Sequence, residues 1–124
     1  MSDPSLPLTQ HEYEEWGDVS QDKDVRDYVH GWCPVSNVCA QDYPAMLITT
    51  SLDDEHVSWT HAAKWAQSIQ NVSTSNEPVL LRVDQDGTGH YGSGGRTQRY
   101  DAMSYSNSFL LSLLDSCTSS FKQN

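Results

Sequence analysis

Basic residues are scarce in this sequence of 124 residues, which holds seven lysines and arginines against 17 aspartates and glutamates. The formal net charge at pH 7 is −10, and no basic cluster is present that would neutralise a phosphate backbone. The composition therefore argues against nucleic acid as a partner, and an anionic membrane surface is disfavoured for the same electrostatic reason. A basic small molecule or peptide remains compatible with this charge.

Cysteine is also sparse, and no stretch of the chain is both long and apolar. Cys33, Cys39 and Cys117 are odd in number and show no paired spacing, so a reducing, cytoplasmic location is expected. There is no C-x-x-C motif, which argues against a zinc site. No apolar run approaches the length of a membrane-spanning helix, and the N-terminus lacks the pattern of a signal peptide, so no membrane association is expected.

Along the chain, apolar runs of strand length alternate with segments whose apolar residues have helical spacing. This alternation of strands and helices predicts an α/β fold. The runs 45–50 and 79–83 have the length and continuous apolarity of parallel strands that are covered on both faces. Between the runs, Ala62, Trp65, Ala66 and Ile69 recur at helical spacing. After the second run a further helical face is lined by Ala102, Met103, Ser106, Phe109, Leu110, Leu113 and Leu114. Gly31 is predicted to end an earlier helix. The predicted helices cover about 11–17, 22–30, 59–70 and 97–115.

Two strands cannot form a stable parallel sheet, because such a sheet needs more strands and helical cover on both faces. Residues 1–124 are therefore expected to be the C-terminal portion of a larger domain, or to need a partner. The polar tail, 116–124, is expected to fray. An incomplete sheet exposes apolar surface and a free strand edge, so a non-catalytic remnant that binds another polypeptide is a second hypothesis.

Reactive side chains follow each predicted strand. Asp53 and Asp54 come after the first strand, and His90 lies in the glycine-rich loop after the second. Because the carboxyl ends of parallel strands meet at one edge of a sheet, a carboxylate can orient the imidazole and leave its other nitrogen as a base. Helix-capping aspartates and a polar loop histidine are the alternative, and from these residues alone the two interpretations have equal weight.

No cofactor or metal ion is expected in the glycine-rich loop. Gly87-x-Gly89-x-x-Gly92 spells a dinucleotide fingerprint, but no further strand follows to complete the binding unit. A calcium loop is rejected because Arg82 and Ser93 occupy its first and last acidic positions. The order of acid and then histidine is instead that of α/β-hydrolases, whose serine in a Gly-x-Ser-x-Gly turn would have to precede residue 1.

Five stretches of the sequence together carry a family resemblance that runs from about Ser5 to Leu114; they are 5–9, 12–17, 40–47, 63–65 and 89–96. In this combination they resemble the oligopeptidase B enzymes of the prolyl oligopeptidase family of serine peptidases. The resemblance implies that the chain is the last part of the catalytic α/β-hydrolase domain, a three-layer α-β-α structure with parallel strands.

The resemblance also implies roles for individual residues. Asp54 matches the triad aspartate and His90 the triad histidine, while Asp53 falls on a neighbouring, non-catalytic position. Glu12 and Glu14 match carboxylates that receive the arginine or lysine side chain of a short peptide substrate, through charge-assisted hydrogen bonds. His56 stands where the family usually has an arginine that helps to hold the substrate backbone, and a weakly charged imidazole is a poor substitute for it.

The implied activity is hydrolysis of short peptides after arginine or lysine, and an esterase of the same fold is a third hypothesis. The sequence departs from the family because it contains no Gly-x-Ser-x-Gly serine, no oxyanion-hole residues and no β-propeller. The chain alone is therefore expected to be nearly inactive, as a fragment, a truncated gene product or a degenerate copy. Its expected partner, besides a basic peptide, is the missing remainder of the catalytic domain.

Overall fold

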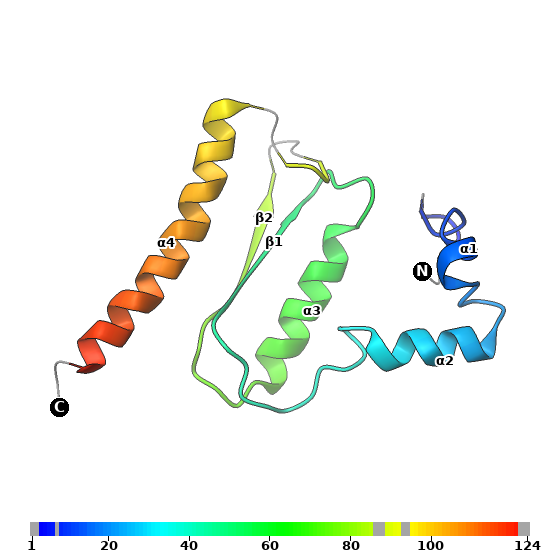
Figure 1. The fold of residues 1–124 in the computed structure, drawn as a ribbon, viewed down its shortest axis with the longest axis horizontal. Coiled ribbons are helices and arrows are strands. Elements are labelled where there is room, and N and C mark those ends of the chain that lie inside the picture. The colour runs from blue at the N-terminus through cyan, green and yellow to red at the C-terminus, as the bar shows by residue number, and fades with distance from the viewer. Residues whose placement is uncertain (1–2, 7, 86–88, 93–94, 122–124) are drawn as a thin grey trace.

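The described part of the chain forms two helices, a strand, a helix, a second strand and a long helix, in that order (Figure 1). The structure is a computed structural model and describes residues 3–6, 8–85, 89–92 and 95–121. The α/β fold class predicted from the alternation of apolar patterns is confirmed. Within the described residues, no helix has both the length and the hydropathy needed to cross a bilayer.

A pair of parallel strands lies at the centre of this arrangement. Strand β1 (Met46–Ser51) is hydrogen-bonded to strand β2 (Val79–Asp84), and the register places Ser51 opposite Asp84. The predicted parallel pairing is therefore confirmed. Because both strands end at the same level, the loops that follow them begin side by side at one edge of the sheet.

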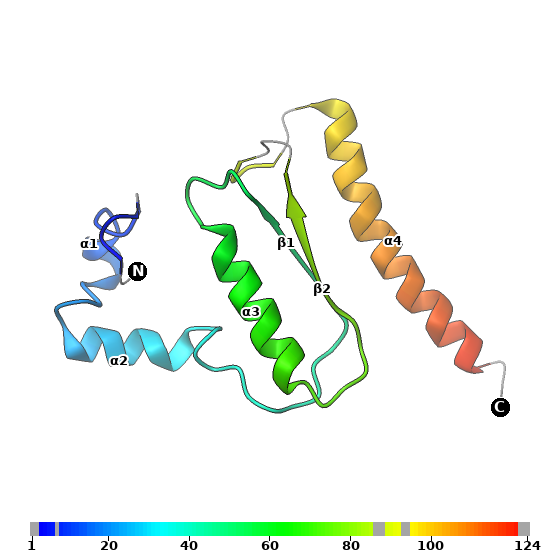
Figure 2. The ribbon, with the colours of Figure 1, turned by 180° about the vertical axis from the view of Figure 1, so that it is seen from behind.

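Helix α3 (Trp59–Val72) covers one face of this sheet and contacts both strands (Figure 2). Ser58 caps the helix, since its side-chain oxygen accepts a hydrogen bond from the backbone N–H of Thr60 at 3.4 Å. The apolar stripe predicted for this helix faces the strands, where Ala66 is buried and Ile69 has no exposed surface. The amphipathic helix is thus confirmed, and its buried stripe forms the centre of the small core.

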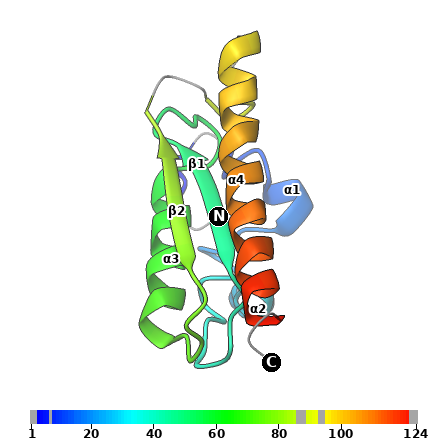
Figure 3. The ribbon, with the colours of Figure 1, turned by 90° about the vertical axis from the view of Figure 1, so that its left-hand side faces the viewer.

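Helix α4 (Arg96–Phe121) lies on the opposite side of the sheet from α3, which gives three layers (Figures 2 and 3). Its predicted apolar face is only partly covered, because a sheet of two strands is too narrow to bury it. Met103, Leu110 and Leu114 remain 52%, 57% and 60% exposed. Leu80 on β2 is also 48% exposed, so the expectation that both strand faces are covered holds only in part.

Helices α1 (Tyr13–Trp16) and α2 (Lys23–Trp32) stand apart from the sheet and meet at an angle (Figure 1). Gly17 allows the close turn between them: its φ is 81°, and a Cβ there would lie 2.8 Å from Val25. The side chain of Asp22 then caps α2 by accepting two backbone N–H hydrogen bonds. Both predicted N-terminal helices are therefore present.

Two helices run further than the sequence predicts. Gly31 does not end α2, which continues to Trp32 and stops at Cys33. Pro34 gives the physical reason, because the residue before a proline avoids the helical region, and Cys33 has an extended ψ of 119°. At the other end of the chain, α4 continues through the first part of the tail to residue 121, and 122–124 lie outside the described residues.

Candidate active site

The turn after β1 holds the carboxylate of Asp54 in place. Its Oδ1 accepts hydrogen bonds from the backbone N–H groups of His56 (2.9 Å) and Val57 (2.8 Å). The Asp54 side chain is 12% exposed. These bonds form within one short turn, so the position of the carboxylate is set by local backbone geometry.

The loop after β2 presents His90 between two glycines with positive φ. Gly89 has a φ of 55° and Gly92 a φ of 77°, which are values that strain a residue with a Cβ. Glycine is therefore favoured at these two positions, which lie on either side of His90 and Tyr91, by the backbone conformation. Residues 86–88 and 93–94 of the same loop lie outside the described residues.

The structure brings Asp54 and His90 together. The Nδ1 atom of His90 lies 3.1 Å from each carboxylate oxygen of Asp54. Because an ionised carboxylate only accepts hydrogen bonds, Nδ1 is the protonated nitrogen and donates to it. The other ring nitrogen, Nε2, is then an acceptor, and no side chain among the described residues bonds to it. This is the arrangement of an orienting acid and a base with a free nitrogen.

Several interactions keep Asp54 ionised at neutral pH. The hydrogen bond from the backbone N–H of Val57 lowers the pKa of the Asp54 carboxyl below its ordinary value of 3.8. The hydrogen bonds from His90 and from the backbone N–H of His56 act in the same direction, while partial desolvation opposes them. Asp54 therefore remains an acceptor for His90 throughout the neutral range.

This lowered pKa predicts a pH-dependent effect of the substitution Asp54→Asn. A carboxyl whose pKa is lower in the folded chain stabilises the fold above its unfolded pKa, and the contribution is lost as the pH falls through the folded pKa. Asp54→Asn should therefore destabilise the chain at about pH 6, and the difference should shrink below about pH 4. Urea unfolding at both pH values measures it. Asp53→Asn is the matched control, and an Asp54→Asn difference that is equal at both pH values would contradict the prediction.

Two further rings surround His90. The ring of His56, predicted as a substrate-binding residue, lies with its centroid 4.7 Å from that of His90. Tyr91 meets both imidazoles edge-on, at 5.1 Å from His90 and 5.7 Å from His56. The sequence offered no signal for Tyr91 beyond its position next to His90, and it was missed. His56 lies in the turn after β1, and His90 and Tyr91 lie in the loop after β2. The parallel pairing of the two strands brings these segments together.

Open space borders the Asp54–His90 pair on two sides. A cavity of about 480 Å³ separates the pair from α4, and a second of about 500 Å³ lies beside the three rings. Within the described residues, no group of three or more histidine, cysteine or acidic side chains is arranged to hold a metal ion. The first cavity is lined in part by Ser51, Asp54, Arg82, Asp84, His90 and Ser106.

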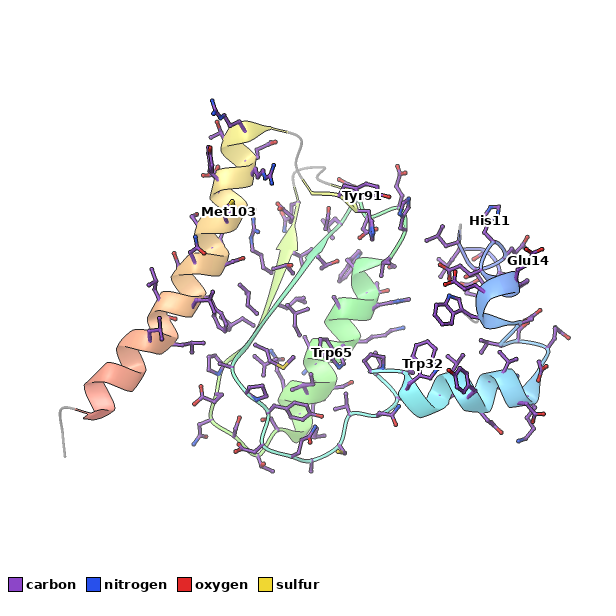
Figure 4. The ribbon with its side chains drawn as sticks, viewed as in Figure 1. His11, Glu14, Trp32, Trp65, Tyr91 and Met103 are labelled. Carbon is purple, nitrogen blue, oxygen red and sulfur yellow. The ribbon has the colours of Figure 1, made fainter. Side chains whose placement is uncertain are left out.

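Glu12 and Glu14, the predicted substrate carboxylates, are not joined to this pair. Both lie on or next to α1, where Glu12 is half-buried at the helix start and Glu14 is exposed. Figure 4 shows Glu14 well separated from Tyr91, the labelled neighbour of His90. Within the described residues, no hydrogen bond or ion pair links either glutamate to the His90 loop, so a ligand common to both would have to extend between two separate parts of the chain.

The sequence profile described as "Prolyl oligopeptidase family" matches residues 1–117. Protease 2 of Moraxella lacunata is 37% identical over 114 residues, and dipeptidyl aminopeptidase BI of Pseudoxanthomonas mexicana is 35% identical over the same length. Each alignment covers 92% of this chain. Among solved structures, oligopeptidase B from Leishmania major superposes with a TM-score of 0.84 at 32% identity, also over 92% of this chain.

These matches are to much longer proteins. The chain spans 16% of the length of each of the two relatives, and 16% of the L. major structure. The small parallel sheet and its helices are therefore similar to one part of an α/β-hydrolase catalytic domain. The names of these two relatives differ in the activity they state, a protease in one case and a dipeptidyl aminopeptidase in the other, at nearly equal identity to this chain.

Proposed function

The chain belongs to the prolyl oligopeptidase family of serine peptidases, and from this premise we propose that it supplies the acid and the base of a serine-peptidase triad. The proposed reaction is hydrolysis of short peptides after arginine or lysine. The observation that supports the acid–base pair is the contact of His90 Nδ1 with both oxygens of Asp54, at 3.1 Å each, whereas the preference for arginine or lysine rests on the family resemblance of Glu12 and Glu14.

In the proposed mechanism, His90 acts through the nitrogen that Asp54 leaves free. Nε2 takes the proton of the nucleophilic serine as it attacks the peptide carbonyl, and later gives a proton to the leaving amine. Asp54 keeps Nδ1 protonated and stabilises the imidazolium that forms between these two steps. The backbone bonds from His56 and Val57 hold Asp54 still while the charge on His90 changes.

The serine itself has to come from another segment, since this sequence contains no Gly-x-Ser-x-Gly turn. We propose that the remainder of the catalytic domain supplies it and packs on the uncovered surfaces described above. Among the described strands β1 pairs only with β2, and the apolar side chains of α4 are more than half exposed at several positions. A free strand edge and an apolar helix face are what a larger α/β sheet would cover.

A chimera tests this function. In it, the present chain replaces the matching segment of Protease 2 from M. lacunata, with which it is 37% identical. The chimera should cleave a fluorogenic peptide amide after arginine, whereas the present chain alone should not. A folded chimera that cleaves only esters would support the esterase of the same fold, and a folded chimera with no hydrolytic activity would support the non-catalytic, polypeptide-binding remnant.

The basic preference gives a separate prediction for Glu12 and Glu14. A charge-assisted hydrogen bond between a carboxylate and a guanidinium stabilises the bound arginine substrate. Glu12→Gln and Glu14→Gln should therefore each lower kcat/KM for the arginine substrate by about tenfold to a hundredfold. Cleavage after a neutral residue should be nearly unchanged. Glu15→Gln, a neighbouring exposed glutamate on α1, is the matched control. Equal losses for the arginine and neutral substrates would show that these glutamates do not select the basic side chain.

A further inference from the structure

His56 contacts both members of the Asp54–His90 pair, in two different ways. Its ring lies against the ring of His90, with centroids 4.7 Å apart and an interplanar angle of 37°. Its backbone N–H donates to Oδ1 of Asp54 at 2.9 Å. One exposed residue in the turn after β1 therefore holds the carboxylate through its backbone and touches the imidazole through its side chain.

The imidazole of His90 needs such a contact, because its hydrogen bond leaves one motion free. Nδ1 is equidistant from the two oxygens of Asp54, so neither oxygen by itself selects a ring orientation. The His90 side chain is also 37% exposed, and little packing from the core restrains it. A tilt of the ring about the direction of the Nδ1–H···carboxylate bond would keep this bond and still carry Nε2 away from any fixed nucleophile, and misplacement by about 1 Å is costly for proton transfer.

The rings of His56 and Tyr91 restrict this motion from two directions. His56 packs on the imidazole at a shallow angle, and Tyr91 meets it edge-on at 5.1 Å and 86°. Tyr91 also meets His56 edge-on at 5.7 Å and 85°, so each ring of the three touches the other two. Offset and edge-to-face contacts of this kind are attractive beyond the area they bury.

We propose that His56 is a positioning residue whose ring holds the imidazole of His90 in the orientation that points Nε2 toward the nucleophile. This inference rests on the proposed function for its catalytic consequence, but the ring contact can be tested without catalysis. It differs from the substrate-binding role that the family resemblance implies for this position. If His56 positions His90, an aromatic ring without polar atoms should hold the imidazole equally well. A contact to the substrate would instead need the polar atoms of His56.

The test compares three variants of the full chain by NMR, using the His90 Nδ1–H proton that is bonded to Asp54. His56→Ala should speed its exchange with water by roughly threefold to tenfold, which is the size of effect expected for losing one aromatic contact. His56→Phe keeps a ring without polar atoms and should restore slow exchange. His61→Ala, an exposed histidine on α3, is the matched control and should leave the signal unchanged.

Unchanged exchange in His56→Ala would overturn the proposal, and so would a His56→Phe variant that exchanges as fast as His56→Ala. Kinetics of the Protease 2 chimera give a second readout. A positioning role predicts that His56→Ala lowers kcat by about tenfold at constant KM and that His56→Phe recovers the loss. A rise in KM at constant kcat in both variants would instead assign His56 to the substrate. An inactive chimera would count against the proposed function, while the NMR result still decides the role of His56.

Discussion

Replacing His90 by alanine is expected to lower kcat/KM of the Protease 2 chimera by about ten-thousandfold or more. The physical reason is that Nε2 of His90 is the proposed acceptor of the serine proton, and among the described residues no other side chain is hydrogen-bonded to the Asp54 carboxylate. Without the imidazole, the serine hydroxyl remains protonated at neutral pH and is a weak nucleophile. The measurement is steady-state hydrolysis of a fluorogenic arginine amide.

A histidine far from the pair controls for unspecific effects of removing an imidazole. His30 is exposed on α2, which stands apart from the sheet, and His30→Ala should retain the activity of the unmodified chimera. Binding of a substrate analogue should survive in His90→Ala, since the substitution removes a proton acceptor and leaves the cavities around it open. Substantial turnover by the folded His90→Ala chimera would mean that another group is the base and that the assignment of His90 is wrong.

The second large effect is expected on stability, from the substitution Ile69→Ala. Ile69 has no exposed surface and packs from α3 against the sheet, at the centre of the small core. Truncating such a side chain typically removes about 2–5 kcal/mol from the free energy of unfolding, through lost burial and the cavity left behind. Few other apolar side chains in the described residues are as deeply buried, so little is available to compensate.

Urea unfolding of the chain, followed by far-ultraviolet circular dichroism, measures this effect. Leu111→Ala is the matched control, because Leu111 on α4 is 60% exposed and alanine is a better helix former than leucine. The control should unfold at nearly the urea concentration of the unmodified chain, whereas Ile69→Ala should be largely unfolded before urea is added. Equal midpoints for the two variants would show that the α3–sheet contact does not determine the stability of this chain.

Sequence patterns predicted the α/β core well, because the periodicity of apolar residues reports directly on which face of an element is buried. The stripe that ends in Ala66 and Ile69 requires a helix, and the two continuous apolar runs require strands beside it. The helix ends were predicted less well. Gly31 was predicted to end α2, but the chain stays helical through Gly31 and Trp32, and the helix stops at Cys33 because Pro34 disfavours the helical region for the residue before it.

The sequence could not decide how far the faces of α4 would be covered. An apolar stripe shows that a helix needs a partner, but it does not show whether that partner is in the same chain. Leu110 and Leu114 belong to the predicted stripe and are nevertheless more than half exposed, since two strands provide too little surface. The same limit applies to Glu12 and Glu14, which the family resemblance relates to His90 and which lie at the start of α1, away from the His90 loop.

By itself the sequence determined the residue types and their order: a strand, an acidic turn, a helix, a second strand and a histidine in a glycine-rich loop. Parallel pairing of the two strands then requires both loops to meet at one edge. Only the tertiary structure decided which contacts form there, because they depend on the turn around Asp54 and the positive φ of Gly89 and Gly92. Those local geometries place Asp54 under the imidazole of His90 and set the ring of His56 against it.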